Sequence, residues 1–266
     1  LAVVDPRAAA WADLPARAAD APCDGTLRSV EDASAAATQS SLVPLLDGAG
    51  TDGTDIIPGV YEGGLKEWEA SHDLVRYVES ASSGLGALSA LRVLELGCGH
   101  GLPGIAALRR GAAVAFTDLN VEVLTSATLP NALLNAGRAR VDERAFFVSG
   151  DWASSELLER LLGWAPAAAP SAASTTPATA SGKFSLILSA ETVYTSEALR
   201  ALHALILRTL APGGVALCAA KRYYFGLGGG TRALCDHAAA AGQLHARVVA
   251  VTEERNVVRE IVELRF

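Results

Sequence analysis

The chain has 266 residues, enough for one large domain or two small ones with a substantial hydrophobic core. Half of the residues are hydrophobic, but no apolar run reaches the roughly 18 residues that a membrane span needs. The net charge of -7 argues against a surface that coats nucleic acid and mildly favours a basic partner. Composition therefore predicts a globular protein with no membrane span and no direct nucleic-acid binding.

The N-terminal part of the chain carries no clear structural pattern. Asp5, Asp13, Asp20 and Asp24 interrupt it, so it lacks the apolar core of a secretory signal. Residues 1–55 are rich in Ala, Ser and Asp without helical or strand periodicity, which predicts a disordered or weakly helical arm. The chain contains no methionine, so we expect it to be a fragment. Its four cysteines show no C-x-x-C spacing, and neither a metal site nor a disulfide framework is expected.

Helical and strand-like segments alternate from about residue 56 onward. The segment Gly64–Val78 has helical apolar spacing, and Pro130 is expected to kink or break the helix that contains it. Residues 165–182, rich in Pro, Ala, Ser and Thr, predict a flexible insertion. The other predicted helices are residues 102–110, 121–135, 197–210 and 231–241, and the predicted strands are residues 91–96, 113–117, 145–149, 184–189, 215–220, 244–252 and 257–266.

This order of elements predicts the fold class. Five strands that alternate with helices indicate a parallel sheet with right-handed crossovers. Only Glu253–Asn256 separates the last two strands, so these should form a hairpin with one antiparallel strand. We therefore expect an α/β fold with a Rossmann-like, seven-stranded, mostly parallel sheet over residues 56–266. Such a C-terminal hairpin is typical of seven-stranded methyltransferases and absent from ordinary dinucleotide-binding domains.

The first predicted strand leads into a glycine-rich turn between Glu95 and Gly101. Glycines at such a strand-to-helix turn let a nucleotide-like ligand approach the backbone. A dinucleotide site needs a small residue three places after Gly99, and Leu102 occupies that position. The spacing E-x-G-x-G-x-G is instead the first motif of methyltransferases that use S-adenosylmethionine. The turn therefore favours that cofactor over a dinucleotide or a purely structural turn.

The residues that follow each strand extend the predicted site, because ligands of open parallel sheets bind beyond the strands' carboxyl ends. Asp118 can accept both ribose hydroxyls, with Leu119 and Asn120 beside the adenine. Asp151 can take the adenine amino group, and Trp152 can cover the ring. Each acid alone has an alternative role as a turn or capping residue. Two acids after consecutive strands, together with the glycine turn, favour a binding site.

Several blocks of sequence resemble the protein-histidine N-methyltransferases, enzymes that modify a histidine in a large-subunit ribosomal protein. The first and last blocks, Ile57–Lys66 and Lys221–Gly230, are the most specific, and the likeness covers about residues 56–266. The resemblance implies that the segment around Trp68–Ser71 closes over the cofactor. Together with the strand-end positions, the predicted cofactor-binding residues are Trp68, Glu69, Ala70, Ser71, Glu95, Gly97, Gly99, Asp118, Leu119, Asn120, Gly150, Asp151, Trp152, Ser189 and Ala190.

The segment after the fourth strand holds the candidate catalytic residues. A neutral imidazole needs little base strength, but one ring N–H must be held so that the other nitrogen faces the methyl group. Glu191 and Tyr194 are the candidates for that acceptor, although Tyr194 can instead pack over the methionine tail of the cofactor. The predicted substrate-binding residues are Lys221, Tyr224, Phe225 and Gly226.

The resemblance further implies a basic ribosomal protein as substrate, a monomer, and a location in the cytoplasm and the nucleus, including the nucleolus. Two alternatives stay open at this point. One is a protein-lysine N-methyltransferase of the same superfamily, which shares the glycine and E-x-x-Y motifs. The other is a module that binds S-adenosylmethionine without turnover.

Overall fold

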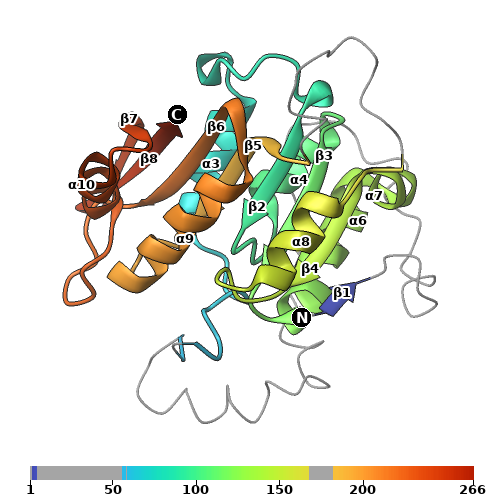
Figure 1. The fold of residues 1–266 in the computed structure, drawn as a ribbon, viewed down its shortest axis with the longest axis horizontal. Helices are drawn as coiled ribbons and strands as arrows, with labels where there is room; N and C mark the ends of the chain where they lie inside the picture. The colour runs from blue at the N-terminus through green and yellow to red at the C-terminus, as the bar shows by residue number, and fades with distance from the viewer. Residues whose placement is uncertain (1, 5–55, 58, 168–181) are drawn as a thin grey trace.

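The computed structural model describes residues 2–4, 56–57, 59–167 and 182–266. An eight-stranded sheet with the order β1-β4-β3-β2-β5-β6-β8-β7 forms its centre (Figure 1). The strands are β1 (Ala2–Val4), β2 (Arg92–Leu96), β3 (Ala113–Asp118), β4 (Ala145–Ser149), β5 (Phe184–Ala190), β6 (Leu210–Lys221), β7 (His245–Glu254) and β8 (Val257–Arg265). The α-helices are α3 (Glu69–Glu79), α4 (Leu102–Arg109), α5 (Val121–Val123), α6 (Leu129–Ala136), α7 (Arg138–Arg144), α8 (Ser155–Gly163), α9 (Ser196–Thr209) and α10 (Thr231–Ala241).

The sheet has the predicted mixture of strand directions. Strands β4, β3, β2, β5 and β6 pair in parallel. Strand β8 runs antiparallel to β6, and β7 pairs with β8 in a hairpin whose turn residues, Arg255 and Asn256, both have positive φ. The prediction of a mostly parallel sheet with one antiparallel strand in a C-terminal hairpin is confirmed. Strand order reverses beside β2, and the carboxyl end of β2 is therefore where an open sheet of this type binds ligands.

The strand β1 is not predicted from the sequence. Ala2–Val4 pair antiparallel with β4, and Ala2 N donates to Ser149 Oγ at 3.1 Å. Three residues are too few to show a strand period, and their partner lies far along the chain. This short strand raises the strand number from the expected seven to eight and covers the backbone groups of the β4 edge. The remainder of the predicted arm, residues 5–55, and most of the predicted insertion, residues 168–181, lie outside the described residues.

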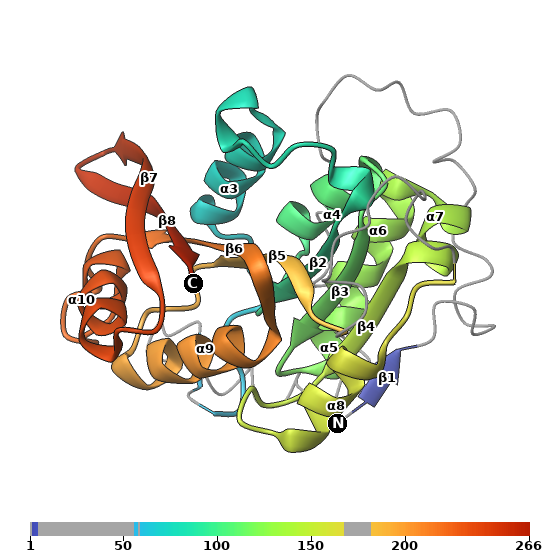
Figure 2. The same cartoon turned by 45° about the horizontal axis from the view of Figure 1, so that its top comes forward.

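Helices cover both faces of the sheet, with α3, α4, α6 and α7 on one face and α8, α9 and α10 on the other (Figure 2). Alternation along β2 explains this arrangement, because Val93 packs in the first core cluster while Leu94 and Leu96 pack in the second. In the first cluster the rings of Phe116 and Phe147 stack with centroids 5.1 Å apart. Burial of each such side chain stabilises the fold by about 1.5–3 kcal/mol. No helix among the described residues is both long and apolar enough to cross a membrane.

Some local predictions need correction and one is confirmed. The helix expected from residue 64 begins only at Glu69, since the preceding residues form a turn closed by a hydrogen bond from Trp68 Nε1 to Gly63 O at 3.0 Å. The irregularity expected at Pro130 in the helix over 121–135 is confirmed as a π-helical turn at Leu124–Thr128, because the missing N–H of proline disfavours a regular helix there. Helices α7 and α8 are short and were not predicted.

Candidate active site

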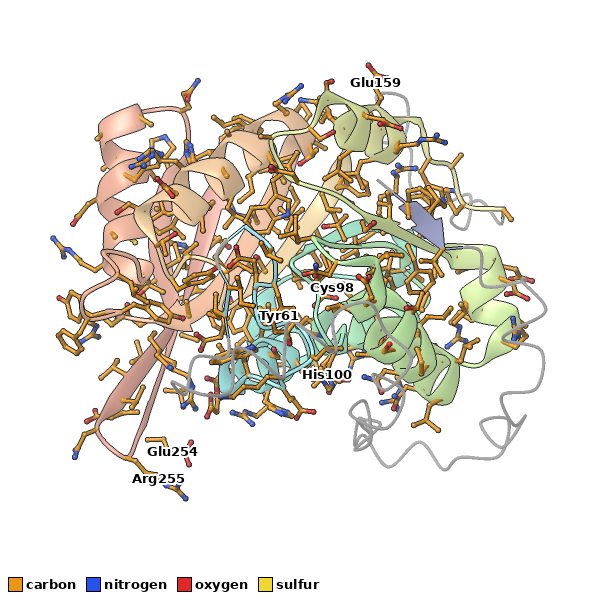
Figure 3. All side chains as sticks on the ribbon, turned by 90° about the horizontal axis from the view of Figure 1, so that it is seen from below. Tyr61, Cys98, His100, Glu159, Glu254 and Arg255 are labelled. Carbon is orange, nitrogen blue, oxygen red and sulfur yellow. The ribbon has the colours of Figure 1, made fainter. Side chains whose placement is uncertain are left out.

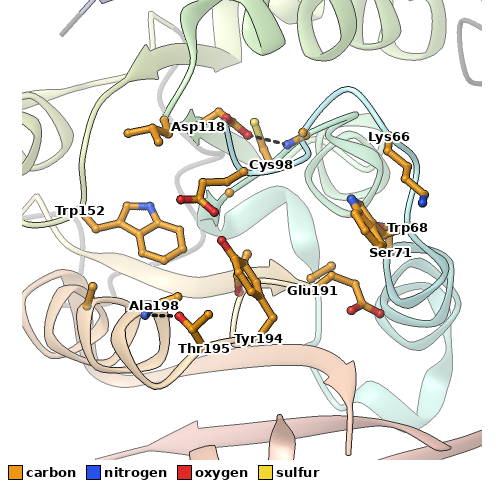
Figure 4. A pocket seen from close by; sticks show the side chains of 18 of the residues that line it. Lys66, Trp68, Ser71, Cys98, Asp118, Trp152, Glu191, Tyr194, Thr195 and Ala198 are labelled. Atoms are coloured by element: carbon orange, nitrogen blue, oxygen red, sulfur yellow. Dashed lines mark hydrogen bonds between the residues drawn. The ribbon is translucent and has the colours of Figure 1, made fainter. Parts of the chain in front are cut away.

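A cavity of about 350 Å³ opens at the carboxyl ends of β2, β3, β4 and β5, where the strand order predicts a ligand. Figure 4 shows Asp118 and Trp152 on one side of it, Glu191 and Trp68 on the other, and Tyr194 between them. The residues that line it are Gly59, Glu62, Gly64, Lys66, Glu67, Trp68, Ser71, Gly97, Cys98, Gly99, His100, Asp118, Leu119, Gly150, Asp151, Trp152, Ala190, Glu191, Thr192, Tyr194, Thr195, Glu197, Ala198 and Ala201.

The segment from residue 59 to residue 68, here called the strap, forms one wall of the cavity. Its own turn is held by Leu65 N, which donates to Tyr61 Oη at 3.0 Å. Asn120 Nδ2 donates to Val60 O at 2.8 Å, and a ring nitrogen of His100 lies 3.0 Å from Leu65 O. Figure 3 shows Tyr61 of the strap in the same central region as Cys98 and His100 of the glycine turn. The strap is thus attached to the two loops that follow β2 and β3.

The glycine turn leaves room for a ligand only because of its residue types. Gly97 has a φ of +63°, and a Cβ there would lie 2.7 Å from Thr192 Cγ2 and 3.4 Å from the Trp152 ring. A larger residue would be strained by its backbone conformation and would also fill the cavity floor. Beneath the turn, Cys98 N donates to Thr117 O at 2.8 Å and fixes the loop to β3.

Asp118 connects the end of β3 to the glycine turn. Its Oδ2 accepts a hydrogen bond from Gly99 N at 3.0 Å, and its Oδ1 accepts one from Asn120 N at 3.2 Å. Burial raises the pKa of Asp118 from its ordinary value of 3.8 to about 6, and the backbone donors oppose that rise only in part. A buried carboxylate that still has lone pairs facing a cavity is suited to accept hydroxyl donors from a ligand.

Glu191 has an unusual position at the end of β5. It is buried and has a φ of +56°, a left-handed conformation that costs a non-glycine residue free energy and is frequent at functional sites. Its Oε2 accepts a hydrogen bond from the Tyr224 hydroxyl, whereas its Oε1 is buried with no hydrogen-bond partner among the described residues. Burial raises the pKa of Glu191, while the Tyr224 hydroxyl and the Lys221 charge counteract this rise.

Aromatic rings surround this carboxylate. The ring of Tyr224 meets that of Tyr194 edge-on with centroids 6.4 Å apart. Lys221 Nζ lies 5.5 Å from the Tyr224 ring centroid and 5.9 Å from that of Trp68. Lys66 Nζ lies 4.6 Å from the Trp68 ring. The two ammonium groups at the Trp68 ring add cation–π attraction at this end of the cavity.

The structure brings most of the predicted site residues together. Both predicted catalytic residues, Glu191 and Tyr194, line the cavity. The predicted cofactor-binding residues that also line it are Trp68, Ser71, Gly97, Gly99, Asp118, Leu119, Gly150, Asp151, Trp152 and Ala190. Asp151 is exposed there, and its Oδ1 accepts a hydrogen bond from Ala153 N at 2.8 Å. Their individual contacts with a cofactor remain predictions.

Five predicted cofactor-binding residues lie outside the cavity lining. Glu95 is buried beneath the turn, where its Oε2 accepts from Gly104 N at 2.9 Å and burial raises its pKa well above the ordinary range. Ser189 Oγ donates to Leu96 O at 2.9 Å, so its hydroxyl connects two strands. Ala70 is enclosed in the core, Glu69 is exposed on α3, and Asn120 holds the strap. These side chains support the cavity wall from behind or beside it.

The predicted substrate-binding residues also lie beside the cavity and do not line it. Tyr224 contacts the cavity-lining residue Glu191, and Lys221 contacts the cavity-lining residue Trp68. Phe225 is 93% exposed, and the neighbouring Gly226 is also exposed. Sequence reasoning missed the wall formed by Thr195, Glu197, Ala198 and Ala201. Thr195 is the N-cap of α9, where its Oγ1 accepts a hydrogen bond from Ala198 N at 3.1 Å. A threonine before a helix is explained by this capping role, so its sequence position does not indicate a cavity.

The sheet order and the position of the cavity define a Rossmann-like methyltransferase fold. The crystal structure of the magnesium protoporphyrin IX methyltransferase of Synechocystis with bound SAH superposes with a TM-score of 0.51, at 16% identity, over 74% of this chain and 84% of that one. Residues 59–225 match the sequence model of a family described as lysine methyltransferase, and the chain belongs to this family.

Two relatives are named as histidine protein methyltransferase 1 homologs. The one from Dictyostelium discoideum is 38% identical over 214 residues, which cover 80% of this chain and 61% of that protein. The one from Rattus norvegicus is 34% identical over 237 residues, covering 80% of this chain and 59% of that protein. The predicted resemblance to protein-histidine methyltransferases is therefore confirmed. The chain spans about 60% of the length of these relatives.

Proposed function

We propose that the protein is a methyltransferase that uses S-adenosylmethionine to methylate an imidazole nitrogen of a protein histidine. The proposal is supported by the family match, by the names of the two relatives and by the arrangement of the cavity. One structural observation carries the choice of nucleophile. It is the Oε1 of Glu191, buried and without a hydrogen-bond partner among the described residues, which can accept one N–H from a substrate ring.

The residues of the cavity fit the cofactor. The space above Gly97, which a Cβ would fill, admits a ligand against the backbone, and Asp118 supplies carboxylate lone pairs for ribose hydroxyls. Trp152 offers an aromatic face near the glycine turn. When bound, S-adenosylmethionine would supply a methyl group on a sulfonium centre, which is already a strong electrophile. The protein's own task is then alignment and exclusion of water.

Glu191 would perform the alignment. Its Oε1 accepts the N–H of the target imidazole, which fixes the tautomer and turns the lone pair of the other nitrogen toward the methyl group. Tyr224 occupies Oε2 and so leaves one defined position for the substrate. Tyr194, whose ring meets that of Tyr224 and lines the cavity, would limit the access of water to this position.

A lysine substrate is the second candidate, because the matching family is described as lysine methyltransferase. A lysine ammonium has an ordinary pKa near 10.4 and must lose a proton before it can attack. An imidazole is mostly neutral at pH 7 and needs only orientation, which one carboxylate oxygen can give. We therefore propose histidine as the methylated residue and a basic protein of the large ribosomal subunit as the substrate. We further propose that the enzyme acts as a monomer in the cytoplasm and the nucleus.

Calorimetric titration with S-adenosylmethionine, followed by a methyl-transfer assay on large-subunit ribosomal proteins, tests this proposal. We expect saturable binding with one site and transfer of label to protein. Binding without any transfer would favour the non-catalytic module, and absence of binding would contradict the cofactor assignment.

A further inference from the structure

The loop between β6 and α10, residues 222–230, is here called the aromatic loop. It projects from the body of the protein next to the first turn of α9 (Figure 1). Three of its large apolar side chains lie in solvent, since Tyr223 is 53%, Phe225 is 93% and Leu227 is 52% exposed. The rings of Tyr223 and Phe225 lie 6.2 Å apart, so these side chains form a patch and are not scattered. A clustered exposed apolar patch is typical of an interaction site.

The backbone of the aromatic loop is fixed against the cavity wall. Gly230 N donates to Val193 O at 2.7 Å, and Gly228 pairs with Thr195, a cavity-lining residue. A Cβ at Gly229 would lie 2.2 Å from Val193 O, so this close approach requires glycine. Ser196 Oγ donates to Gly228 O at 3.2 Å. The backbone that carries the exposed side chains is therefore fixed beside the cavity wall.

Alternation along the loop gives its side chains two different roles. Tyr224 turns inward to donate to Glu191, while its neighbours Tyr223 and Phe225 turn outward. A chain segment bound on the outward patch would thus lie next to the position where Glu191 orients the reacting side chain. The patch is continuous with the candidate active site through Tyr224 and Thr195.

The charges around the cavity indicate the kind of segment that fits. Carboxylates outnumber ammonium groups in its lining, where Lys66 is accompanied by Glu62, Glu67, Asp118, Asp151, Glu191 and Glu197. A cavity lining in which carboxylates predominate attracts a basic chain, and an exposed apolar patch favours large apolar side chains. The acidic lining and the apolar patch together match a segment that carries both basic and large apolar side chains.

We propose that the aromatic loop docks the stretch of the substrate protein that flanks the methylated residue, and that this stretch is basic and contains large apolar residues. This inference rests on the proposed function of the cavity. The loop contributes affinity and selects the sequence around the target, while Glu191 orients the target itself. Recognition therefore lies within a few residues of the modified side chain.

Fluorescence anisotropy with labelled peptide pools tests the docking surface without any need for turnover. Each of the three pools has a central histidine and differs in its flanking positions. The first pool carries Leu, Phe and Lys there, the second carries Ser and Lys, and the third carries Leu, Phe and Glu. With S-adenosylhomocysteine present, we expect the first pool to bind about tenfold more tightly than either of the others. The double variant Phe225→Ser/Leu227→Ser should abolish the apolar preference. The control Val251→Ser, at a 58% exposed position on the edge strand β7, should keep it.

Equal affinity for the three pools, or equal behaviour of the double variant and the control, would overturn the proposal. The proposal would also be overturned if the wild-type protein were a dimer, the double variant were a monomer, and the peptide affinities of the two were equal. That result would assign the patch to contacts between copies of the protein. Methyl transfer to pools with a central lysine in place of histidine separates this test from the proposed function. Preference for the apolar, basic flanks with label only on lysine would keep the docking surface and refute the histidine assignment.

Discussion

The hydroxyl of Tyr224 donates a hydrogen bond to one carboxylate oxygen of Glu191 and leaves the other oxygen buried without a partner among the described residues. This relationship joins the aromatic loop to the end of β5. It also assigns Tyr224 a role different from the predicted substrate contact, because its hydroxyl is already engaged with Glu191 and lies 3.4 Å from Lys221 N. Under the proposed function, Tyr224 is a positioning residue that acts through Glu191.

Replacement of Glu191 by Gln should slow methyl transfer while the dissociation constant for S-adenosylmethionine stays unchanged. An amide presents only one oxygen, and its other end is a donor that opposes a substrate N–H. Loss of a hydrogen bond to a charged group costs about 1.5–3 kcal/mol, so the rate should fall roughly 10- to 100-fold. Single-turnover kinetics and calorimetric titration measure the two quantities. A parallel loss of cofactor affinity would place Glu191 in the cofactor site instead.

Replacement of Tyr224 by Phe removes the donor that fixes Glu191 and keeps the ring. We expect a smaller fall in rate, about tenfold, together with a shift of the acidic limb of the pH–rate profile to higher pH. The shift is expected because the hydrogen bond from Tyr224 opposes the effect of burial on the pKa of Glu191. Tyr77→Phe, on α3 and outside both the cavity lining and the aromatic loop, is the matched control and should change neither quantity. A Tyr224→Phe variant with wild-type rate and profile would remove the positioning role.

Replacement of Gly97 by Arg should abolish cofactor binding, because the new side chain fills the space against Thr192 and Trp152. Gly84 provides a close control. It has the same φ of +63°, but a Cβ there would meet no atom within 4 Å. Gly84→Arg therefore carries the backbone penalty alone. Calorimetric titration of both folded variants decides the question, and full affinity in Gly97→Arg would contradict the assignment of the turn.

Affinity for S-adenosylmethionine should rise between pH 5 and pH 7, because the ionised form of Asp118 is the better acceptor and its pKa is raised to about 6. Below that pKa we expect up to about a tenfold change per pH unit. The folding stability of the free protein depends on pH in the opposite direction to the cofactor affinity. The stability contributed by the raised pKa is fully present below 3.8 and is lost as the pH rises through about 6. Asp118→Asn should bind weakly and without this dependence, and an unchanged pH profile in that variant would exclude Asp118 as its cause.

Replacement of residues 168–181 by a short Gly/Ser linker should cost little stability, since their composition lacks a core-forming pattern. The flanks should be kept, because Ala167 N donates to Glu143 O at 3.0 Å and Arg92 Nη2 donates to Gly182 O at 3.2 Å. Thermal unfolding measures the effect. A fall in Tm of roughly 10 °C or more would mean that the segment packs against the domain.

Much of the fold follows from local sequence patterns. The strand Ala145–Ser149 and the helix Thr231–Ala241 are predicted at their observed bounds, since apolar spacing and flanking turn residues define both. The strand Ala2–Val4 could not be predicted, because its existence depends on pairing with β4. The same holds for the π-helical turn, which Pro130 alone does not specify.

The site was predictable where backbone position decides it and less so where side-chain direction does. Gly97, Asp118 and Trp152 line the cavity because each lies at or just beyond the end of a strand that points to it. Glu95 and Tyr224 differ from expectation because their directions depend on tertiary contacts, with Gly104 beneath the turn and with Glu191 across the loop. No sequence pattern reports the positive φ of Glu191, which aims its carboxylate.

The identity of the methylated side chain tests the central claim most directly. Large-subunit ribosomal proteins should be incubated with the protein and labelled S-adenosylmethionine, and the modified residue located by mass spectrometry. We predict a methyl group on a histidine ring nitrogen, with a rate that rises through the imidazole pKa near 6.5 and then levels off. Label on lysine with none on histidine, at a rate that keeps rising well above neutral pH, would contradict the account.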